Sequence, residues 1–277
     1  MRSGVWLRFL SSFPAVLLFV VSTSASAFTA SVLDYRHVES GTTTVFSDDF
    51  EDGALDAGWL GTQGNVSESG GALHLSTVGG APVVLDPPLS GNFSAALAPL
   101  SAAISGPGAN VVFEATFAPN ALGAGDSFGL ITVVSDVLAG TTLDVLDLRL
   151  TRRTVAEAAN LGGSAGLNLT FVHSPSGFGF PTLTNDLALA AMPTTPVTFR
   201  LEFSSATSDF LATVTADGGA TTLAAFAPVP LNPGLPGTLT LLAPQVVAAT
   251  IVPEPNAVLL IGLGLGALAH RRRAVGR

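Results

Sequence analysis

Five acidic side chains lie within nine residues near position 50: Asp48, Asp49, Glu51, Asp52 and Asp56. Calcium takes several oxygen ligands from closely spaced carboxylates and carbonyls, so Asp48, Asp49 and Asp52 are candidate ligands of a calcium ion. Their spacing is not that of an EF-hand loop. Aspartate also opens ordinary turns by accepting hydrogen bonds from its own backbone. The sequence therefore leaves two interpretations of this stretch, a calcium site and a plain acidic turn.

Paired carboxylates could instead hydrolyse glycosidic bonds, which requires two of them a few ångströms apart. Glu114 and Glu202 are single acids in two different stretches, and they could meet only if those stretches were neighbours. Asp144 and Asp147 are three residues apart, which on a strand directs them to opposite faces. We expect solvated side chains at Glu114 and Glu202 and no catalytic residue.

Other reactive groups are scarce. None of the four histidines forms a pair at zinc-ligand spacing, and no Gly-x-Ser-x-Gly motif precedes a suitable Asp and His. The chain has no cysteine, which excludes disulfides, thiolate metal sites and thiol nucleophiles. We therefore expect no bound cofactor other than calcium.

The elements that would position these side chains are strands. Residues 111–117, 197–204 and 210–219 alternate apolar and polar side chains, with an Asp-Gly turn ending the last. Further runs of strand composition cover 127–135, 146–153, 167–173 and 237–242. Only Thr154–Leu161 has a helical pattern, and it is short. Strands at this spacing, each with one apolar face, predict an all-β fold: an antiparallel sandwich of two sheets over one core.

The segment Phe46–Ser76 resembles the opening of concanavalin A-like (laminin-G-like) jelly-roll domains. The resemblance is carried by Asp48-Asp49-Phe50, by Trp59 and by the stretch Gly71–Leu75, and it extends over residues 44–250 or so. It implies a jelly roll of two curved sheets, and domains of this kind often hold a calcium ion.

The same resemblance includes glycan hydrolases. Those similar to laminarinases carry Glu-x-Asp-x-x-Glu on one strand, and this sequence lacks that motif. Glycan binding without hydrolysis remains open, although few aromatic side chains are available to stack on sugars. The candidates are Trp59, Tyr35 and the phenylalanines of Ser176–Phe180.

The first 27 residues have the pattern of a secretory signal peptide. Arg2 and Arg8 precede an apolar stretch over residues 9–21, and Ala25-Ser26-Ala27 forms a small-residue cleavage site. We expect signal peptidase to cut between Ala27 and Phe28. Residues 28–43 then read as a linker before a β-sandwich domain at 44–251.

The last 26 residues, Val252 to Arg277, have three parts. Val252-Pro253-Glu254-Pro255 is a stiff segment that cannot continue a sheet or a helix, and Pro253-Glu254-Pro255 is its motif. Residues 257–269 contain no polar side chain and predict a transmembrane helix, short against the roughly 20 residues that a bilayer needs. Arg271, Arg272 and Arg273 then place the end of the chain on the cytoplasmic side by the positive-inside rule.

This tail resembles the PEP-CTERM sorting signal of Gram-negative bacteria, which is also called an ice-binding-protein C-terminal domain, a name that implies no activity here. The resemblance implies an exosortase as partner, a membrane transpeptidase that cuts near Pro253-Glu254-Pro255. The precursor would be held transiently in the cytoplasmic membrane. The freed protein would then join the outer surface or the exopolysaccharide matrix.

Charge follows the same division. Residues 28–252 hold five arginines against 19 acidic side chains, while the other six arginines lie in the two terminal segments; the chain has no lysine. An acidic body offers no basic stripe for nucleic acid. The sequence thus predicts an exported, non-enzymatic surface or matrix protein, with a glycan as the candidate ligand. The alternatives are a secreted polysaccharide hydrolase and a structural matrix protein without a ligand.

Overall fold

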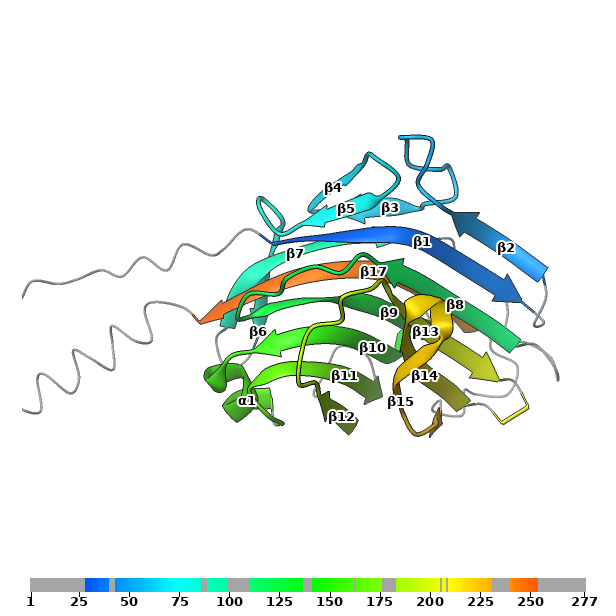
Figure 1. The fold of residues 1–277 in the computed structure, drawn as a ribbon. Helices are drawn as coiled ribbons and strands as arrows, with labels where there is room; N and C mark the ends of the chain where they lie inside the picture. The colour runs from blue at the N-terminus through cyan, green and yellow to red at the C-terminus, as the bar shows by residue number, and fades with distance from the viewer. Residues whose placement is uncertain are drawn as a thin grey trace, which may run out of the picture.

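The chain folds into an antiparallel sandwich of two sheets, which confirms the predicted all-β class (Figure 1). The computed structural model describes residues 28–39, 43–85, 89–98, 110–136, 141–161, 163–175, 183–204, 206–207, 209–230 and 240–253. The predicted signal peptide, with Ala25 and Ala27, lies outside these residues, and so do the predicted tail helix and Arg271, Arg272 and Arg273. Among the described residues, no helix is long and apolar enough to cross a membrane.

The first sheet, sheet A, has nine strands and contains the start of the fold. Its order is β15 (Thr221–Ala225), β14 (Asp209–Ala216), β13 (Val197–Ser204), β8 (Asn110–Phe117), β1 (Thr29–Glu39), β5 (Leu73–Ser76) and β4 (Asn65–Glu68), with β16 (Val229–Pro230) beside β14 and β2 (Thr43–Asp48) beside β1. A single 3-10 turn, η1 (Asp217–Gly219), joins β14 to β15. It occupies the Asp-Gly turn expected from the sequence.

The second sheet, sheet B, has eight strands and contains the end of the fold. Its order is β12 (Leu183–Ala188), β11 (Gly166–Pro175), β10 (Thr141–Arg153), β9 (Asp126–Asp136), β17 (Thr240–Pro253), β7 (Leu89–Leu97) and β3 (Gly61–Gln63), with β6 (Ala81–Leu85) beside β7. The last strand of the chain, β17, is therefore a central strand. Neighbours in both sheets run antiparallel, as expected.

Strand alternation builds the main core between the sheets. β13 buries every second residue, and its inward side chains meet aromatic side chains from β8 and β9. Phe117 lies 4.9 Å from Phe128 and 5.4 Å from Phe199, measured between ring centroids, and all three are fully buried. The apolar face that the sequence predicted for residues 197–204 and 111–117 is thus the face that packs against sheet B.

Sheet B is apolar on both faces in its central strands. Ala95, Ile131, Val133, Val145 and Val247 are at most 9% exposed and form a second cluster. Each is the immediate sequence neighbour of a main-core residue, so each points away from the main core. Strands buried on both faces show continuous apolar runs rather than clean alternation. This explains why β9 and β17 are less regular in sequence than β13.

The segment 28–43 is not a linker, because residues 29–39 form β1. This strand pairs with β8 on one side and with β5 and β2 on the other. Its inward side chains are Ala30, Val32, Tyr35 and His37, so the period of two is broken once. The break coincides with a register shift against β8 between Val32 and Asp34, as a β-bulge produces. The irregular pattern hid the strand.

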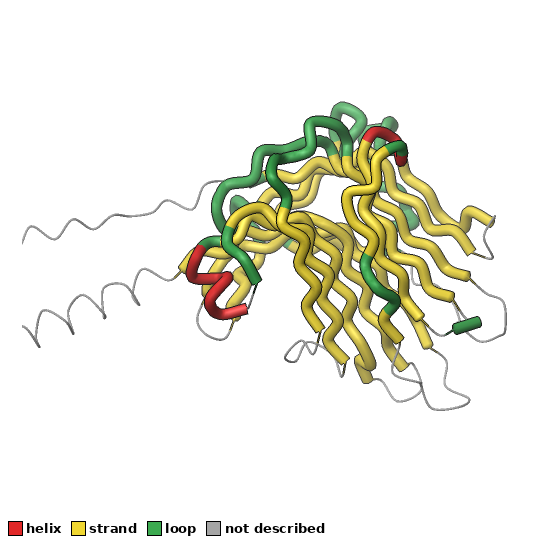
Figure 2. The backbone as a smooth tube through the Cα atoms, turned by 60° about the horizontal axis from the view of Figure 1, so that its bottom comes forward, coloured by secondary structure: helices red, strands yellow, loops and turns green. Residues whose placement is uncertain are grey.

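The predicted helical turn is confirmed as α1 (Val155–Leu161), the one α-helix in the described part of the chain. Thr154 and Glu157 cap its first turn reciprocally. The Glu157 backbone N–H donates to Thr154 Oγ1 at 3.1 Å, and the Thr154 backbone N–H donates to Glu157 Oε2 at 2.6 Å. This capping box satisfies two donors that a helix start leaves free. Figure 2 shows α1 at one side of a molecule otherwise built of strands.

Both ends of the described fold leave the sandwich at the same end, where β1 begins and β17 finishes (Figure 1). Phe28 and Thr250 are each hydrogen-bonded to Thr77, which ties the two ends together. β17 also continues to Pro253, which pairs with Leu89 of β7. The expectation that residues 252–255 cannot continue a sheet is therefore wrong for the first two. A strand can end on proline, because only the lost N–H fails to pair.

Acidification is expected to destabilise the fold through His37. This side chain is fully buried, packs on Phe113 with ring centroids 4.9 Å apart, and has Nε2 3.3 Å from Glu39 Oε1. Burial lowers the pKa of His37, and Glu39 opposes that shift only in part. The unfolded chain therefore binds the proton first as pH falls below about 6.5. The free energy of unfolding should then drop by at most roughly 1.4 kcal/mol per pH unit.

Urea titrations at pH 7.5, 6.5 and 5.5 measure this slope. His37→Phe should flatten it, whereas His74→Gln, a change at a more exposed histidine, should leave it unchanged. An unaltered slope in His37→Phe would contradict the assignment.

Candidate functional site

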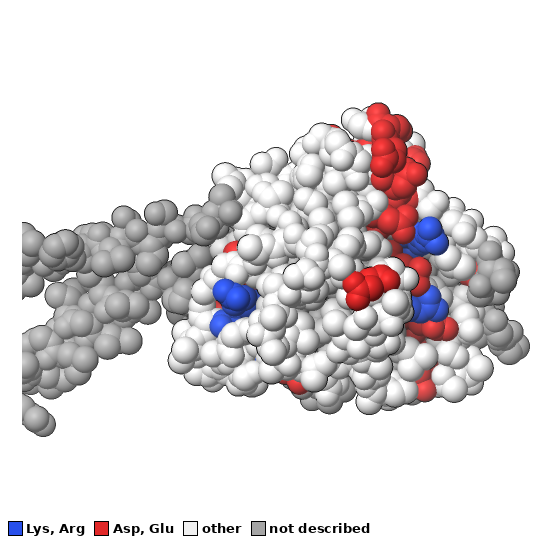
Figure 3. All heavy atoms as spheres, in the orientation of Figure 1, with Lys and Arg blue, Asp and Glu red and all other residues white. Residues whose placement is uncertain are grey.

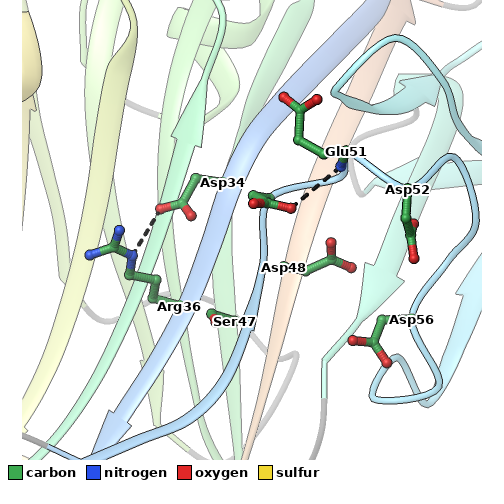
Figure 4. A pocket seen from close by; sticks show the side chains of 8 residues that line it. Asp34, Arg36, Ser47, Asp48, Glu51, Asp52 and Asp56 are labelled. Atoms are coloured by element: carbon green, nitrogen blue, oxygen red, sulfur yellow. Dashed lines mark hydrogen bonds and ion pairs between the residues drawn. The ribbon is translucent and has the colours of Figure 1, made fainter.

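An acidic groove lies on the outer side of β1 and β2, with a volume of about 510 Å³. Its lining comes from β1, from the end of β2 and from the loop that follows: Asp34, Arg36, Ser47, Asp48, Asp49, Glu51, Asp52 and Asp56. Asp34 and Arg36 lie on one side of the groove, and Asp52 and Asp56 lie on the other (Figure 4). The structure thus brings the three predicted calcium ligands to one place and adds Asp34 and Arg36, which the sequence analysis missed.

Asp48 is a structural corner of this groove. Its side chain is 9% exposed, and each carboxylate oxygen accepts a hydrogen bond. The backbone N–H of Phe50 donates to Oδ1 at 2.9 Å, and the indole N–H of Trp59 donates to Oδ2 at 2.7 Å. Phe50 has a positive φ of 57°, which is uncommon for a residue other than glycine. Asp48 therefore holds a tight turn against a buried tryptophan.

The other acids in the loop bond to their own backbone. Asp49, Asp52 and Asp56 each accept a hydrogen bond from the backbone N–H two residues later, at 3.4, 3.1 and 3.2 Å. These are Asx turns, the ordinary use of aspartate that the sequence left open. Within the described residues, no three His, Cys, Asp or Glu side chains gather closely enough to hold a metal ion. Asp48, Asp49 and Asp52 as placed do not fit a calcium site, and calcium binding stays a prediction.

Negative charge accumulates in the groove. Asp34 pairs with Arg36 at 3.2 Å, yet partial burial raises the pKa of Asp34, and Glu114 and Asp49 raise it further. Burial also raises the pKa of Glu68, at the end of β4, and the nearby carboxylates of Asp52 and Asp48 raise it further. Figure 3 shows most of the acidic side chains gathered along one side of this face, with some basic groups among them and others apart, at the left of the view. The groove suits hydrogen-bond donors and cations rather than anions.

Glu114 and Glu202 do come together, on the outer face of sheet A. Their strands β8 and β13 are neighbours, and Arg200 lies opposite Glu114 in the register. The Arg200 guanidinium donates to Glu114 Oε1 and, at 2.9 Å, to Glu202 Oε2. Burial of Arg200 lowers its pKa, but the two carboxylates outweigh this effect and raise it overall. Both acids are thus bound to one permanent cation.

Asp144 and Asp147 point to opposite faces, as their spacing predicted. Asp144 is fully buried in the sandwich, with Oδ1 3.4 Å from His173 Nε2. Asp147 lies on the other face and accepts from Arg149 Nε at 2.6 Å. The two carboxylates cannot act on one substrate atom.

Two aromatic candidates for sugar stacking are not available, because both are buried. Trp59 is 8% exposed and Tyr35 is fully buried, with their ring centroids 5.1 Å apart. Trp59 also packs on Phe46 and Phe50. The third candidate, the phenylalanines of Ser176–Phe180, lies outside the described residues. Trp59 and Tyr35 therefore pack against the loop and expose no flat ring face to a ligand.

Of the predicted sorting motif, only Pro253 belongs to the described residues, as the last residue of β17. Glu254 and Pro255 lie beyond them. β17 therefore leads directly into the motif, with no loop between the folded body and the first proline.

Several solved structures resemble this chain at low sequence identity. Peanut lectin, solved with a nine-residue peptide, has 14% identity, covers 79% of this chain and 99% of its own, and gives a TM-score of 0.43. Lectin I-B4 from Griffonia simplicifolia, in a metal-free form, has 12% identity, 78% and 96% coverage, and a TM-score of 0.43. A glycosyl hydrolase family 16 protein from Mycobacterium smegmatis has 15% identity, 77% and 93% coverage, and a TM-score of 0.36.

No family model matches the chain, and no curated protein matches its sequence.

Proposed function

We propose that this protein is exported, held transiently in the cytoplasmic membrane by its tail, and released by an exosortase to the outer surface or the exopolysaccharide matrix. The motif Pro253-Glu254-Pro255, with the apolar stretch and the arginines that follow it, carries this proposal. The pattern of residues 1–27 supplies the matching export signal. In this reading the β-sandwich is the cargo, and it is not an enzyme.

The positions of the chain ends support the proposal. Strand β1 begins at Thr29, two residues after the expected signal cleavage site, and strand β17 extends to Pro253, the first residue of the motif. Both ends lie at one end of the sandwich (Figure 1). A β-sandwich held at a membrane through both chain ends at once would therefore keep β1 and β17 folded.

The sorting motif is tested by replacing Pro253, Glu254 and Pro255 with alanine in the full chain. We expect an uncut form that stays in the membrane fraction, because the stiff recognition segment is lost while the apolar helix remains. Fractionation of native cells, with both chain ends mapped by mass spectrometry, measures the outcome.

A second Pro-x-Pro in the body provides the matched control. Pro228→Ala with Pro230→Ala changes the two prolines around Val229 and keeps that buried side chain. This control should be processed like the wild type. Processing and release of the motif variant at the wild-type level would contradict the sorting proposal.

The non-enzymatic assignment is supported by Arg200. A retaining glycosidase needs two carboxyl groups directed to the scissile bond, one as nucleophile and one as acid. Glu114 and Glu202 instead share a guanidinium. The alternative, a polysaccharide hydrolase, would require reducing ends released by the wild type and lost in Glu114→Gln.

A glycan ligand, if this body has one, would meet the acidic groove. Its carboxylates accept hydrogen bonds, and sugar hydroxyls donate them. With Trp59 and Tyr35 buried, neither adds a stacking contact there. We therefore propose weak glycan binding that depends on hydrogen bonds and avoids anionic polysaccharides.

A further inference from the structure

The buried carboxylate of Asp126, which has no cationic partner among the described residues, lies close to Phe28. Asp126 is 3% exposed, and its oxygens accept hydrogen bonds from Thr250 Oγ1 at 2.8 Å and from the backbone N–H of Gly123 at 2.7 Å. No ion pair to Asp126 occurs among the described residues. Burial of an ionised carboxylate is costly unless an opposite charge lies near.

Two threonine hydroxyls connect Asp126 to the backbone of Phe28. Thr250 Oγ1 lies 2.9 Å from Thr77 Oγ1, and the backbone N–H of Phe28 donates to Thr77 Oγ1 at 3.2 Å. Both threonines are at most 3% exposed, and Phe28 is 4% exposed. Thr77 in turn donates to the Phe28 carbonyl at 3.1 Å. The nitrogen of Phe28 is therefore enclosed in a polar chain that ends at a carboxylate.

Cleavage between Ala27 and Phe28 changes this nitrogen from a neutral amide to an α-ammonium group with three donors and a positive charge. We propose that the α-ammonium group of Phe28 is the countercharge of Asp126, held through Thr77 and Thr250. The inference rests on the proposed export and adds a consequence to it. Removing the leader completes a buried electrostatic pair and fastens the start of β1 to the end of β17, three residues before the sorting motif.

The hydrogen-bond directions are consistent. The ammonium donates to Thr77 Oγ1, whose own proton then goes to Thr250 Oγ1, 2.9 Å away, instead of the Phe28 carbonyl at 3.1 Å. Thr250 has a single hydroxyl proton, which then goes to Asp126 Oδ1. Partial burial raises the pKa of Asp126, and the hydrogen bonds from Thr250 and Gly123 oppose that shift, which agrees with a carboxylate that still lacks a full charge partner.

The absence of lysine makes the test specific. The α-amino group is the only primary amine of the mature chain, so an N-hydroxysuccinimide acetate reagent modifies it alone. The exported full chain is purified, its first residue is mapped by mass spectrometry, and acetylation is followed at pH 7.5. We expect the folded wild type to react at least about tenfold more slowly than the urea-unfolded chain. Acetylation should lower its Tm by about 3–6 °C.

Variants assign the effect to the polar chain. Asp126→Asn and Thr250→Val should react about as fast as the unfolded chain and lose no Tm on acetylation. Thr250→Ser, which keeps the hydroxyl, and Asp209→Asn, a change on distant β14, should behave like the wild type. Equal acetylation rates in folded and unfolded wild type, or an equal Tm loss in Asp126→Asn, would overturn the proposal.

The first residue separates the two proposals. A chain recovered with its leader attached contradicts the export itself. A chain that begins at a residue other than Phe28 overturns the pairing but leaves export intact. A chain that begins at Phe28 and reacts freely overturns only the pairing.

Discussion

Replacing Phe128 with alanine is expected to lower the free energy of unfolding by about 4 kcal/mol. This ring is fully buried on β9, where it contacts Phe117 and Phe199 from sheet A and Phe28 at the start of the fold. Removing it leaves a cavity between the two sheets, lined by rigid aromatic side chains that cannot easily fill it. The loss therefore combines the transfer of a large apolar side chain with an empty volume.

Urea denaturation of the Phe28–Pro253 body measures this loss, since both sheets and their common core lie within it. Leu60→Ala is the control, because Leu60 is 61% exposed and should change the free energy by at most about 0.5 kcal/mol. A loss below 1 kcal/mol for Phe128→Ala would mean that the sheets do not pack on this ring.

Replacing Asp48 with alanine is expected to cost about 3 kcal/mol. The change leaves two buried donors, the Phe50 backbone N–H and the Trp59 indole N–H, without their acceptor. Each unpaired buried donor costs roughly 1–3 kcal/mol. Urea denaturation followed by tryptophan fluorescence reports the transition directly, because Trp59 is the donor that loses its partner.

The same variant separates the two interpretations of the acidic stretch. If Asp48 only supports the loop, the Asp48→Ala variant loses the same free energy of unfolding in EDTA as in calcium. The Tm of the wild type then does not change on chelation. A calcium ion bound only to the folded state would add stability that EDTA removes. Asp49→Ala, which removes one 3.4 Å hydrogen bond from an exposed turn, should cost at most about 0.5 kcal/mol.

Strands with one face toward water can be predicted from the sequence. Strands that contain a bulge or are buried on both faces are harder to predict. The sequence predicts a strand at residues 197–204, and β13 has these bounds, because each inward Phe, Leu or Val is followed by a polar residue. The sequence pattern did not reveal β1, because a bulge interrupts its alternation. The next inward side chain after Val32 is Tyr35 and not Asp34. β17 was recognised only at its start, since its middle is buried on both faces and reads as a plain apolar run.

The site was predictable as a cluster but not as a geometry. Acids close in sequence remain close in space, so Asp48, Asp49 and Asp52 line one groove. The Asp48 side chain points inward because Trp59 is its hydrogen-bond partner. The position of Trp59 depends in turn on packing against Tyr35 of β1. The shared contact of Glu114 and Glu202 with Arg200 required the order of β8 and β13, which local patterns do not specify.

The central position of β17 has a mechanical consequence for a protein held by its tail. Force applied beyond Pro253 enters the sandwich along β17, which pairs with β9 from Thr240 to Thr250 and with β7 from Gln245 to Pro253. A pull along a strand loads all these backbone hydrogen bonds in shear, so many must break together. A tail that followed an edge strand would instead let the sheet peel one bond at a time. If the protein is held by its tail as proposed, the pull reaches a central strand, which resists it better than an edge strand would.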